Sequence, residues 1–499
     1  MKRTHLLVLI LSSLAFVLAA CQPQVFAPPR LATATSLAES SPDTPKEPLI
    51  LPAPTPTASS TRRDAIETNS TEPINIWINE TSQEHQELLT AMMNEFTQQS
   101  GIDVALQLVS PRLLPDLMQT AVLSNTLPDI VLHPIEFTVT WSEEGILDPE
   151  LASSLIDEIG FDSFDQSALD LASVNGHTAA IPSDGFQQIL LYRKDWFDQQ
   201  GLETPDNYAD MITNAEAIFD PENIVSGFVI PTESNLITTH RAFEHLAIAN
   251  GCQLIDNRGE VRLLDENCQE AIDFYYAIVN QFSPTGVQTD TSARNAFLEG
   301  RTGMIMSSPA ILNDLVEATP LDQNTGIVTS ITGSDPNAEA ANFGNLTYLG
   351  ITTAANPETA SAFAKYWFGE GYGQWLAVES ERKVPMYLGT RDQPNRYFDE
   401  WGELPFIADK SIADIYGEDT VNLLKSSVAD TNRWGFDHGQ GAVTGKLYES
   451  LTISIVLQEM LSGYFDSQQT ILEATNRVVE LIPNYQFEIV LTPTPAPDS

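Results

Sequence analysis

Short apolar segments alternate with amphipathic helical segments in this chain, and this alternation constrains the fold more than any other feature. INIWIN (residues 74–79) is rich in strand-forming residues, and the next segment, TSQEHQELLTAMMNEFTQQSG, places apolar residues at helical spacing before a terminal glycine. DVALQLVS (103–110) and PDIVLHP (128–134) have the character of further strands, with the helical stretch LLPDLMQTAVLSN between them. Strands that alternate with helices predict an α/β fold with a mostly parallel sheet covered on both faces.

The same alternation returns later in the chain. AFLEGRTGMIMSSPAIL (296–312) predicts a helix that ends at Gly300, then a strand and a new helix. NPETASAFAKYWF (356–368) predicts a helix with Asn356 as its N-cap and proline at its first position. The segment from 72 to 481 holds about 410 residues, more than one hydrophobic core usually serves, so we expect two lobes.

The N-terminus has the pattern of a lipoprotein signal. Lys2 and Arg3 precede the apolar run LLVLILSSLAFVL, and the small residues of LAAC lead to Cys21. Because the apolar run is short for a membrane span, we expect removal of residues 1–20 and attachment of lipid to Cys21. An uncleaved membrane anchor is the alternative. Either way, the chain is expected outside the cytoplasm, held at the cell membrane.

Two segments outside the predicted lobes are rich in Pro, Thr and Ser. Residues 21–71 contain little apolar surface to bury, and we expect a disordered tether between the lipid and the folded part. Residues 482–499, which end in LTPTPAPDS, are expected to form a shorter tail of the same kind.

The charge balance excludes one class of partner. The chain has 68 acidic and 24 basic residues, a formal net charge of −44. Binding to nucleic acid requires a basic surface, so we expect no nucleic-acid partner. The acidity either keeps the protein soluble and apart from its neighbours or indicates affinity for an amine or a cation.

Cys252 and Cys268 are the cysteines that remain if Cys21 carries lipid. The turn-forming sequence DNRG lies between them and lets the segment fold back on itself. In an oxidising compartment a disulfide here would contribute about 3 kcal/mol to stability. Spacing alone does not establish the geometry, so two free buried thiols are the alternative.

No catalytic motif is visible in the sequence. A Gly-rich phosphate loop, a G-x-S-x-G elbow, an H-E-x-x-H pair and clustered Cys and His ligands are all missing. His240 and His245 are five residues apart, which places them on different faces of a helix. We therefore expect no catalytic residue, no metal and no cofactor. A pair of glycosidase carboxylates is the alternative that abundant acidic residues leave open.

Several segments together resemble the extracellular solute-binding proteins of ABC importers, in the group that contains maltose-binding and other sugar-binding lipoproteins. The resemblance covers about residues 74–481, and no segment is specific alone. In order, the segments are INIWIN, FTQQSGIDV, LPDIVLHP with EEGILDP, NGHTAAIPSDGFQQILLYRKDWFDQQGLETP, AFLEGRTGMIMS and TYLGITTAANPETASAFAKYWF.

The resemblance implies a type II periplasmic-binding-protein-like fold, with two discontinuous α/β lobes and a ligand in the cleft between them. The first lobe would comprise residues 72–185 and 347–384, and the second residues 186–346 and 385–481. The chain would cross between the lobes near residues 186–191, 346–350 and 383–387.

The resemblance also implies a function. The chain would be the membrane-anchored binding component of an ABC importer, a monomer that delivers a small polar ligand to the transmembrane permease subunits. Maltose-binding relatives carry an aromatic residue at the position of His133 and a tryptophan near MSSPAI, both missing here. A monosaccharide, disaccharide or polyol is therefore expected in place of maltodextrin. The alternatives are a surface sensor or scaffold without a transport role, or a binding protein for an amine or a cation.

Candidate ligand-binding residues follow from the predicted strand ends, because ligands of α/β sheets lie beyond the carboxyl ends of strands. Each candidate could instead be a solvated loop residue or a helix cap. The candidates are Asn79, Glu80, Thr81, His133, Glu136, Asp184, Phe186, Gln187, Ser307, Ser308 and Tyr348.

A further group of candidates lies in the irregular segment DTNRWGFDHGQGAVTGKLYES (430–450). Trp434 lies in a Gly-rich loop between Arg433 and Gly435, with Asp437 close behind. A tryptophan in such a loop can stack on a sugar ring while charged neighbours bind its hydroxyls. The alternative is a ring that plugs the structure. Trp375 lies in a helical stretch and is expected in the core.

Overall fold

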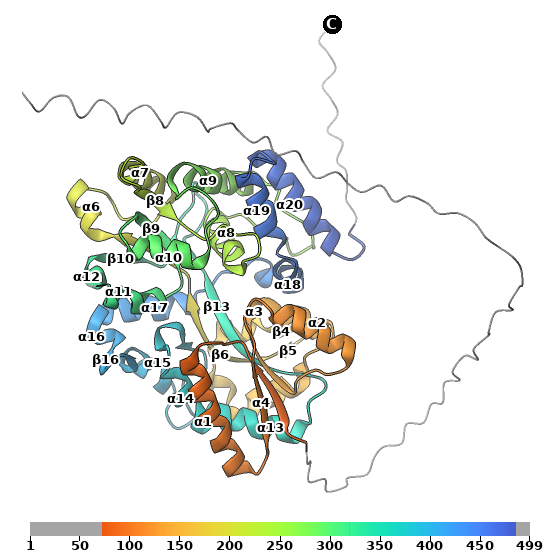
Figure 1. The fold of residues 1–499 in the computed structure, drawn as a ribbon. Helices are drawn as coiled ribbons and strands as arrows, with labels where there is room; N and C mark the ends of the chain where they lie inside the picture. The colour runs from red at the N-terminus through yellow and green to blue at the C-terminus, as the bar shows by residue number, and fades with distance from the viewer. Residues whose placement is uncertain (1–71, 319, 486–499) are drawn as a thin grey trace, which may run out of the picture. The chain divides into compact units, whose positions relative to one another are not determined.

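A computed structural model describes residues 72–318 and 320–485 of the chain (Figure 1). The predicted signal peptide, Cys21, the predicted tether and residues 486–499 of the predicted tail lie outside the described residues. The described residues belong to one compact unit. Within them, no helix combines the length and the apolar character that crossing a bilayer requires.

A six-stranded sheet contains the strands predicted near the N-terminus. Its order is β14-β6-β13-β3-β1-β2. The strands are β1 (Ile74–Ile78), β2 (Val104–Leu108), β3 (Ile130–Pro134), β6 (Ile181–Gln187), β13 (Gly344–Ile351) and β14 (Val384–Pro385). β1 is parallel to β2 and β3, while β13 is antiparallel to both β3 and β6. The carboxyl ends of β1, β3 and β6 therefore meet at one edge of the sheet.

Helices cover this sheet because their apolar faces match its buried strands. The helix α1 (Gln83–Ser100) is capped by Gly101 in the left-handed conformation (φ 74°). Its Leu89, Met92 and Phe96 are buried in one cluster with strand residues such as Ile76. The other helices of this region are α2 (Leu114–Ser124), α3 (Ile135–Glu143), α4 (Pro149–Ile159), α5 (Gln166–Leu171), α13 (Pro357–Tyr366) and α14 (Tyr372–Leu376).

A second sheet has four strands in the order β10-β7-β9-β8. Its strands are β7 (Ile189–Arg193), β8 (Ser226–Val229), β9 (Thr302–Ser307) and β10 (Thr325–Val328). The helices that follow these strands or pack near them are α6 (Lys194–Gln200), α7 (Tyr208–Ile218), α8 (Ile237–Ala249), α9 (Glu266–Phe282), α10 (Asp290–Leu298), α11 (Ile311–Glu317) and α12 (Leu321–Asn324).

The chain passes directly from the first sheet to the second and returns through a longer segment. β6 ends at Gln187 in the first sheet, and β7 begins at Ile189 in the second. On the return, the chain leaves the second sheet at Val328 and reaches β13 at Gly344 by way of β12 (Ala341–Asn342), which pairs with β11 (Ser330–Ile331) in a separate two-stranded sheet. Figure 1 shows β6 and β13 in the middle of the folded part. These connections keep the two sheets next to each other.

The C-terminal helices are divided between the two sheets. α17 (Glu418–Ala429) contacts β6, β13 and β14, and α18 (Gly441–Ser450) packs on α3. α19 (Thr452–Leu461) and α20 (Ser467–Leu481) contact α8 and α9, beside the second sheet. The segment 385–481 was assigned as a whole to the second lobe, but these contacts distribute it over both sheets. The assignment rested on sequence order, which does not reveal such long-range packing.

Short elements complete the described structure. They are η1 (Phe161–Ser163), β4 (Ser173–Val174), β5 (His177–Thr178), β11 (Ser330–Ile331), β12 (Ala341–Asn342), the π-helical turn η2 (Trp367–Gly371), η3 (Ser380–Arg382), α15 (Arg396–Glu400), η4 (Trp401–Glu403), β15 (Pro405–Ile407), β16 (Lys410–Ser411), α16 (Ile412–Tyr416) and η5 (Phe436–His438).

A disulfide joins Cys252 to Cys268. Both residues are buried in the hydrophobic cluster beside the second sheet. The structure therefore contains the disulfide and not the alternative of two free thiols.

Candidate functional site

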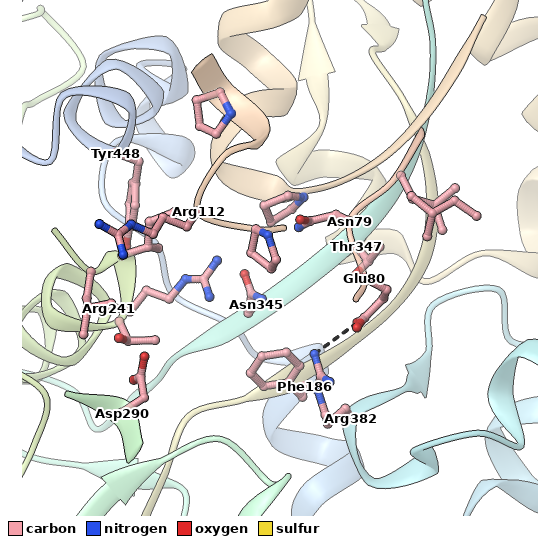
Figure 2. A pocket seen from close by; sticks show the side chains of 18 of the residues that line it. Asn79, Glu80, Arg112, Phe186, Arg241, Asp290, Asn345, Thr347, Arg382 and Tyr448 are labelled. Carbon is pink, nitrogen blue, oxygen red and sulfur yellow. Dashed lines mark hydrogen bonds and ion pairs between the residues drawn. The ribbon is translucent and has the colours of Figure 1, made fainter. Parts of the chain in front are cut away.

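A cavity of about 240 Å³ lies at the carboxyl edge of the six-stranded sheet (Figure 2). The ends of β1, β3, β6 and β13 form one wall, and residues of α8, α10 and α18 form the opposite wall. The polar and aromatic residues that line it include Asn79, Glu80, Arg112, Asp184, Phe186, Arg241, Asp290, Asn345, Thr347, Trp375, Arg382, Lys383, Tyr448 and Glu449.

A second cavity of about 380 Å³ adjoins the first. It extends toward β9, where Ser307 and Ser308 line it together with Arg294. We call the two cavities together the cleft. Pockets of about 300–1,000 Å³ hold small organic ligands, so the cleft is large enough for a mono- or disaccharide. The residues common to both cavities are Pro111, Phe186, Thr238, Arg241, Asp290, Asn345 and Arg382.

Two amide side chains in the cleft have acceptors that the described residues leave unused. Asn79 follows β1, and Asn345 lies on β13 at the same edge of the sheet. The Oδ1 atoms of both are buried without a hydrogen-bond partner among residues 72–318 and 320–485. A buried acceptor without a partner is costly, so a ligand hydroxyl at either position would be stabilised.

The segment before β14 brings a group of charges to one end of the cleft. Arg382 lies 3.1 Å from Glu80 and 2.6 Å from Glu379, and its guanidinium carbon is 6.0 Å from the ring centre of Phe186. Lys383 Nζ lies 2.6 Å from His85 Nε2. This end of the cleft therefore holds an ordered cation next to an aromatic surface.

Arg382 and Lys383 border a cluster of potential metal ligands. Glu80, His85 and Glu379 place potential ligand atoms within 4.8 Å of one another. Burial lowers the pKa of Lys383 to about 8 and, together with Lys383, that of His85 to about 3. At neutral pH, Arg382 and most of the Lys383 ammonium groups are charged, and they would repel a further cation.

Asp184 and Trp375 form the floor of the cleft. Asp184 is buried and accepts hydrogen bonds from Ser183 Oγ (2.6 Å) and Trp375 Nε1 (2.7 Å). Burial raises the pKa of Asp184. Trp375 was expected in the core, and although it is only 2% exposed, it also lines the cleft. The indole is thus both a packing element and part of the site.

A buried ion network supports the opposite wall. Arg241 Nε donates to Glu136 Oε1 at 2.8 Å, and Arg433 lies 3.1 Å from both Glu136 and Glu244. Tyr448 donates to Glu244 at 2.7 Å. Burial opposes ionisation of Glu136, but the two arginines outweigh it and lower the pKa to about 2. This network fixes Arg241 and Tyr448 at the surface of the cleft.

Six of the predicted site residues line the cleft. Asn79, Glu80, Asp184 and Phe186 line the first cavity, and Ser307 and Ser308 the second. Thr81 is exposed and lines neither cavity. Glu136 lies behind the wall, where it orients Arg241.

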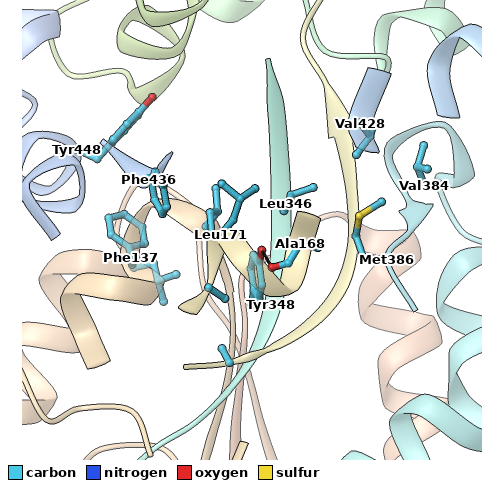
Figure 3. Close-up of a cluster of buried hydrophobic side chains, with 14 of the residues drawn as sticks. Phe137, Ala168, Leu171, Leu346, Tyr348, Val384, Met386, Val428, Phe436 and Tyr448 are labelled. Carbon is cyan, nitrogen blue, oxygen red and sulfur yellow. Dashed lines mark hydrogen bonds between the residues drawn. The ribbon is translucent and has the colours of Figure 1, made fainter. Parts of the chain in front are cut away.

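His133, Gln187 and Tyr348 are buried outside the cleft because of the strand geometry. Successive residues of a strand point to opposite faces. Leu132 and Pro134 line the cleft, so His133 between them points away and packs against Trp141. Tyr348 likewise follows the lining residue Thr347, and its hydroxyl donates to Ala168 O at 2.7 Å (Figure 3).

Trp434 and its neighbours lie elsewhere. Trp434 is 2% exposed, and its Nε1 donates to the carbonyl of Cys252 at 2.8 Å. With Arg433 and Asp437 it lines a separate cavity of about 150 Å³. The aromatic residues that line the cleft are instead Phe186, Phe343, Trp375 and Tyr448.

Four residues that line the cleft were not among the predicted site residues: Arg112, Arg241, Asn345 and Tyr448. Asn345 could have been predicted, because it lies on β13 directly before the predicted crossing at residues 346–350. Arg241 and Tyr448 lie on helices with no local signal, and only the packing of α8 and α18 brings them to the cleft.

The chain is similar in sequence to known binding proteins. The family model described as bacterial extracellular solute-binding protein matches residues 79–374. The putative ABC transporter periplasmic-binding protein YcjN of Escherichia coli K12 is 23% identical over 81% of this chain and 91% of its own length. The mannitol-binding protein of Pseudomonas aeruginosa is 26% identical over 50% of this chain and 58% of its own.

Solved structures share the fold. A sugar transporter protein of Arthrobacter chlorophenolicus with bound laminaribiose has a TM-score of 0.66 at 15% identity, covering 82% of this chain and 100% of its own. The GacH receptor of Streptomyces glaucescens has a TM-score of 0.64 at 18% identity, covering 83% and 99%. This likeness confirms the predicted α/β fold of the type II periplasmic-binding-protein kind.

Proposed function

Since the chain belongs to the family of bacterial extracellular solute-binding proteins, we propose that it captures a sugar or polyol in the cleft and delivers it to an ABC permease. The mannitol-binding relative and a neighbour of similar fold with bound D-mannitol support a ligand of this class. We propose binding without catalysis, by a monomer that has no nucleic-acid partner.

The observation that carries this proposal is the composition of the cleft. It combines aromatic faces, the unused amide acceptors of Asn79 and Asn345, and charged groups already fixed by neighbours. Aromatic rings stack on the apolar face of a sugar, and amides and fixed charges bind its hydroxyls.

Closure of two lobes over the ligand would complete the site. We propose the lobes as residues 72–185 with 347–384, and 186–346 with 385–481, with α17 in contact with the first sheet and α18 packed on α3. A ligand bound to Asn79 on one side and Asp290 on the other gains contacts in the closed form. That difference in affinity would shift the population toward closure, the form a permease could recognise.

The extracellular family and the sequence together support a location outside the cytoplasm. We propose that lipid on Cys21 anchors the chain to the cell membrane through the segment 21–71. Labelling with a fatty-acid analogue tests this anchor, and C21A should abolish the label.

A thermal-shift screen tests the proposed ligand class. Monosaccharides, disaccharides and polyols are compared with amines, amino acids and divalent cations. A ligand at 100 times its Kd should stabilise the protein by about 2.7 kcal/mol. Stabilisation by a sugar or polyol would support the proposal. Stabilisation by amines or cations alone would favour the alternative suggested by the acidic composition.

A further inference from the structure

Basic residues are concentrated in the cleft of a chain that has few of them. The chain has 24 basic against 68 acidic residues. The cleft, by contrast, is lined by as many basic as acidic residues: Arg112, Arg241, Arg294, Arg382 and Lys383 against Glu80, Asp116, Asp184, Asp290 and Glu449. The overall composition does not account for this enrichment in basic side chains, so the enrichment calls for an explanation within the site.

Arg112 and Arg241 have donors left for a ligand. Arg112 lies in the loop between β2 and α2, and its hydrogen-bond contact is with the amide oxygen of Asn235, at 2.6 Å in the orientation that satisfies that amide. Arg241 uses Nε for Glu136, and its two Nη groups have no hydrogen-bond acceptor within the described ranges. Arg382, by contrast, is already paired with Glu80 and Glu379.

Arg112 and Arg241 are placed to act together. In the view of Figure 2, the guanidinium of Arg112 lies beside Tyr448, and that of Arg241 lies between it and Asn345. The buried bond to Glu136 orients the guanidinium of Arg241 before any ligand arrives. Two guanidinium groups at one end of a cavity present the donor pattern that binds carboxylate or phosphate oxygens.

The acidic residues of the cleft oppose this charge less than their number suggests. Burial raises the pKa of Glu80 and of Asp290 above their ordinary values. Burial also raises the pKa of Glu449 to about 7. These carboxyl groups hold protons more readily than exposed ones do, whereas the arginines stay charged.

We propose that the solute is an anionic carbohydrate, whose carboxylate or phosphate group binds Arg112 and Arg241 while its hydroxyls bind Asn79 and Asn345. This inference rests on the proposed function and specifies its ligand. The negative charge elsewhere on the protein is screened over about 8 Å at physiological salt. The local arginines therefore decide whether an anion is held.

Calorimetric titration of the full chain with matched ligands tests the inference. D-glucose, D-glucuronate and D-glucose 6-phosphate share one ring and differ at one carbon, and D-galactose with D-galacturonate and D-mannitol with D-mannonate extend the series. At least one anionic member should bind ten-fold or more tightly than its neutral counterpart. Whether a carboxylate or a phosphate is preferred identifies the anionic group.

Variants assign the preference to Arg112. R112Q should weaken binding of the anionic ligand about ten-fold and leave neutral ligands within about two-fold, and R112K should lie between. R258Q is the control, because Arg258 is 66% exposed and lies outside the cleft. Thermal unfolding of each variant establishes that it is folded.

Two results would overturn the inference while the proposed function stands. One is equal or tighter binding of the neutral members, and the other is an R112Q affinity indistinguishable from that of R258Q. A complete lack of binding by every sugar, polyol and sugar acid would instead count against the proposed function itself.

Discussion

Glu136 shows how a single buried charge shapes the wall of the cleft. It is fully buried and lies between Arg241 and Arg433, which hold it ionised. Its second oxygen, Oε2, has no hydrogen-bond partner among the described residues. A buried charge of this kind adds little net stability, but it fixes the groups around it. Its role here is to orient Arg241 toward the ligand.

Phe186 and Trp434 should respond differently to truncation. Phe186 is half-buried and lines both cavities, while Trp434 is buried and donates a hydrogen bond to the carbonyl oxygen of Cys252. We expect F186A to weaken ligand binding with little change in stability, since aromatic contacts to a ligand are lost. W434A should lower the free energy of unfolding by about 3–5 kcal/mol and leave the affinity of the folded protein nearly unchanged.

Urea unfolding and calorimetric titration of both variants check this pair. A W434A protein that keeps its stability but loses its ligand would show that the ring contacts the ligand after all. The original expectation for Trp434 would then stand, and the assignment of the cleft would be wrong.

Glu381 gives the stability a pH dependence. Burial raises its pKa from 4.5 to about 7, so the folded state holds the proton more tightly than the unfolded state. The contribution of Glu381 to the free energy of unfolding is complete below pH 4.5 and is lost as the pH rises to 7. E381Q should therefore be more stable than the parent by about 3 kcal/mol above pH 7, and equally stable below pH 4.5.

Urea unfolding at about pH 8 and about pH 4 measures the difference. E339Q serves as the control, because Glu339 is exposed. An equal effect of E381Q at both pH values would contradict the raised pKa.

At the scale of elements, the sequence predicts features that local residues determine, and it does not predict features that long-range contacts determine. The start of α13 was predictable, because Asn356 caps it by accepting from the backbone N–H groups of Glu358 and Thr359. The end of α1 at Gly101 was equally local. The side of β3 that faces the cleft was not predictable: all five of its residues are buried, so no polar alternation marks one face.

The close contact of α3 and α18 gives a further prediction. A Cβ on Gly445 would collide with Thr140 Oγ1 and the carbonyl of Glu136. G445A should push the helices apart and lower the free energy of unfolding by about 1–3 kcal/mol. Because α18 carries Tyr448, ligand affinity should fall as well.

G373A is the matched control, since a Cβ on Gly373 would have no atom within 4 Å and the residue lies in α14. Chemical denaturation and ligand titration compare the two variants. Equal stability of G445A and G373A would mean that the α3–α18 contact is not tightly constrained.

At the scale of the whole molecule, the order of segments predicted the fold, whereas the site needed the structure. A resemblance carried by many short segments fixes how the strands are connected. The cleft depends on where α8, α10 and α18 bring Arg241, Asp290 and Tyr448, and these residues lie far from the strand ends in the sequence. Trp434 was misplaced for the same reason, because its loop packs under α8.

The central claim is that a small solute binds between the strand ends of the first sheet and the helices α8, α10 and α18. A crystal structure of the chain with a stabilising carbohydrate tests it most directly. We expect ligand density against Phe186, within hydrogen-bond distance of Asn79 and Asn345. Density in the cavity beside Trp434, or an empty cleft at a saturating concentration of that ligand, would contradict it.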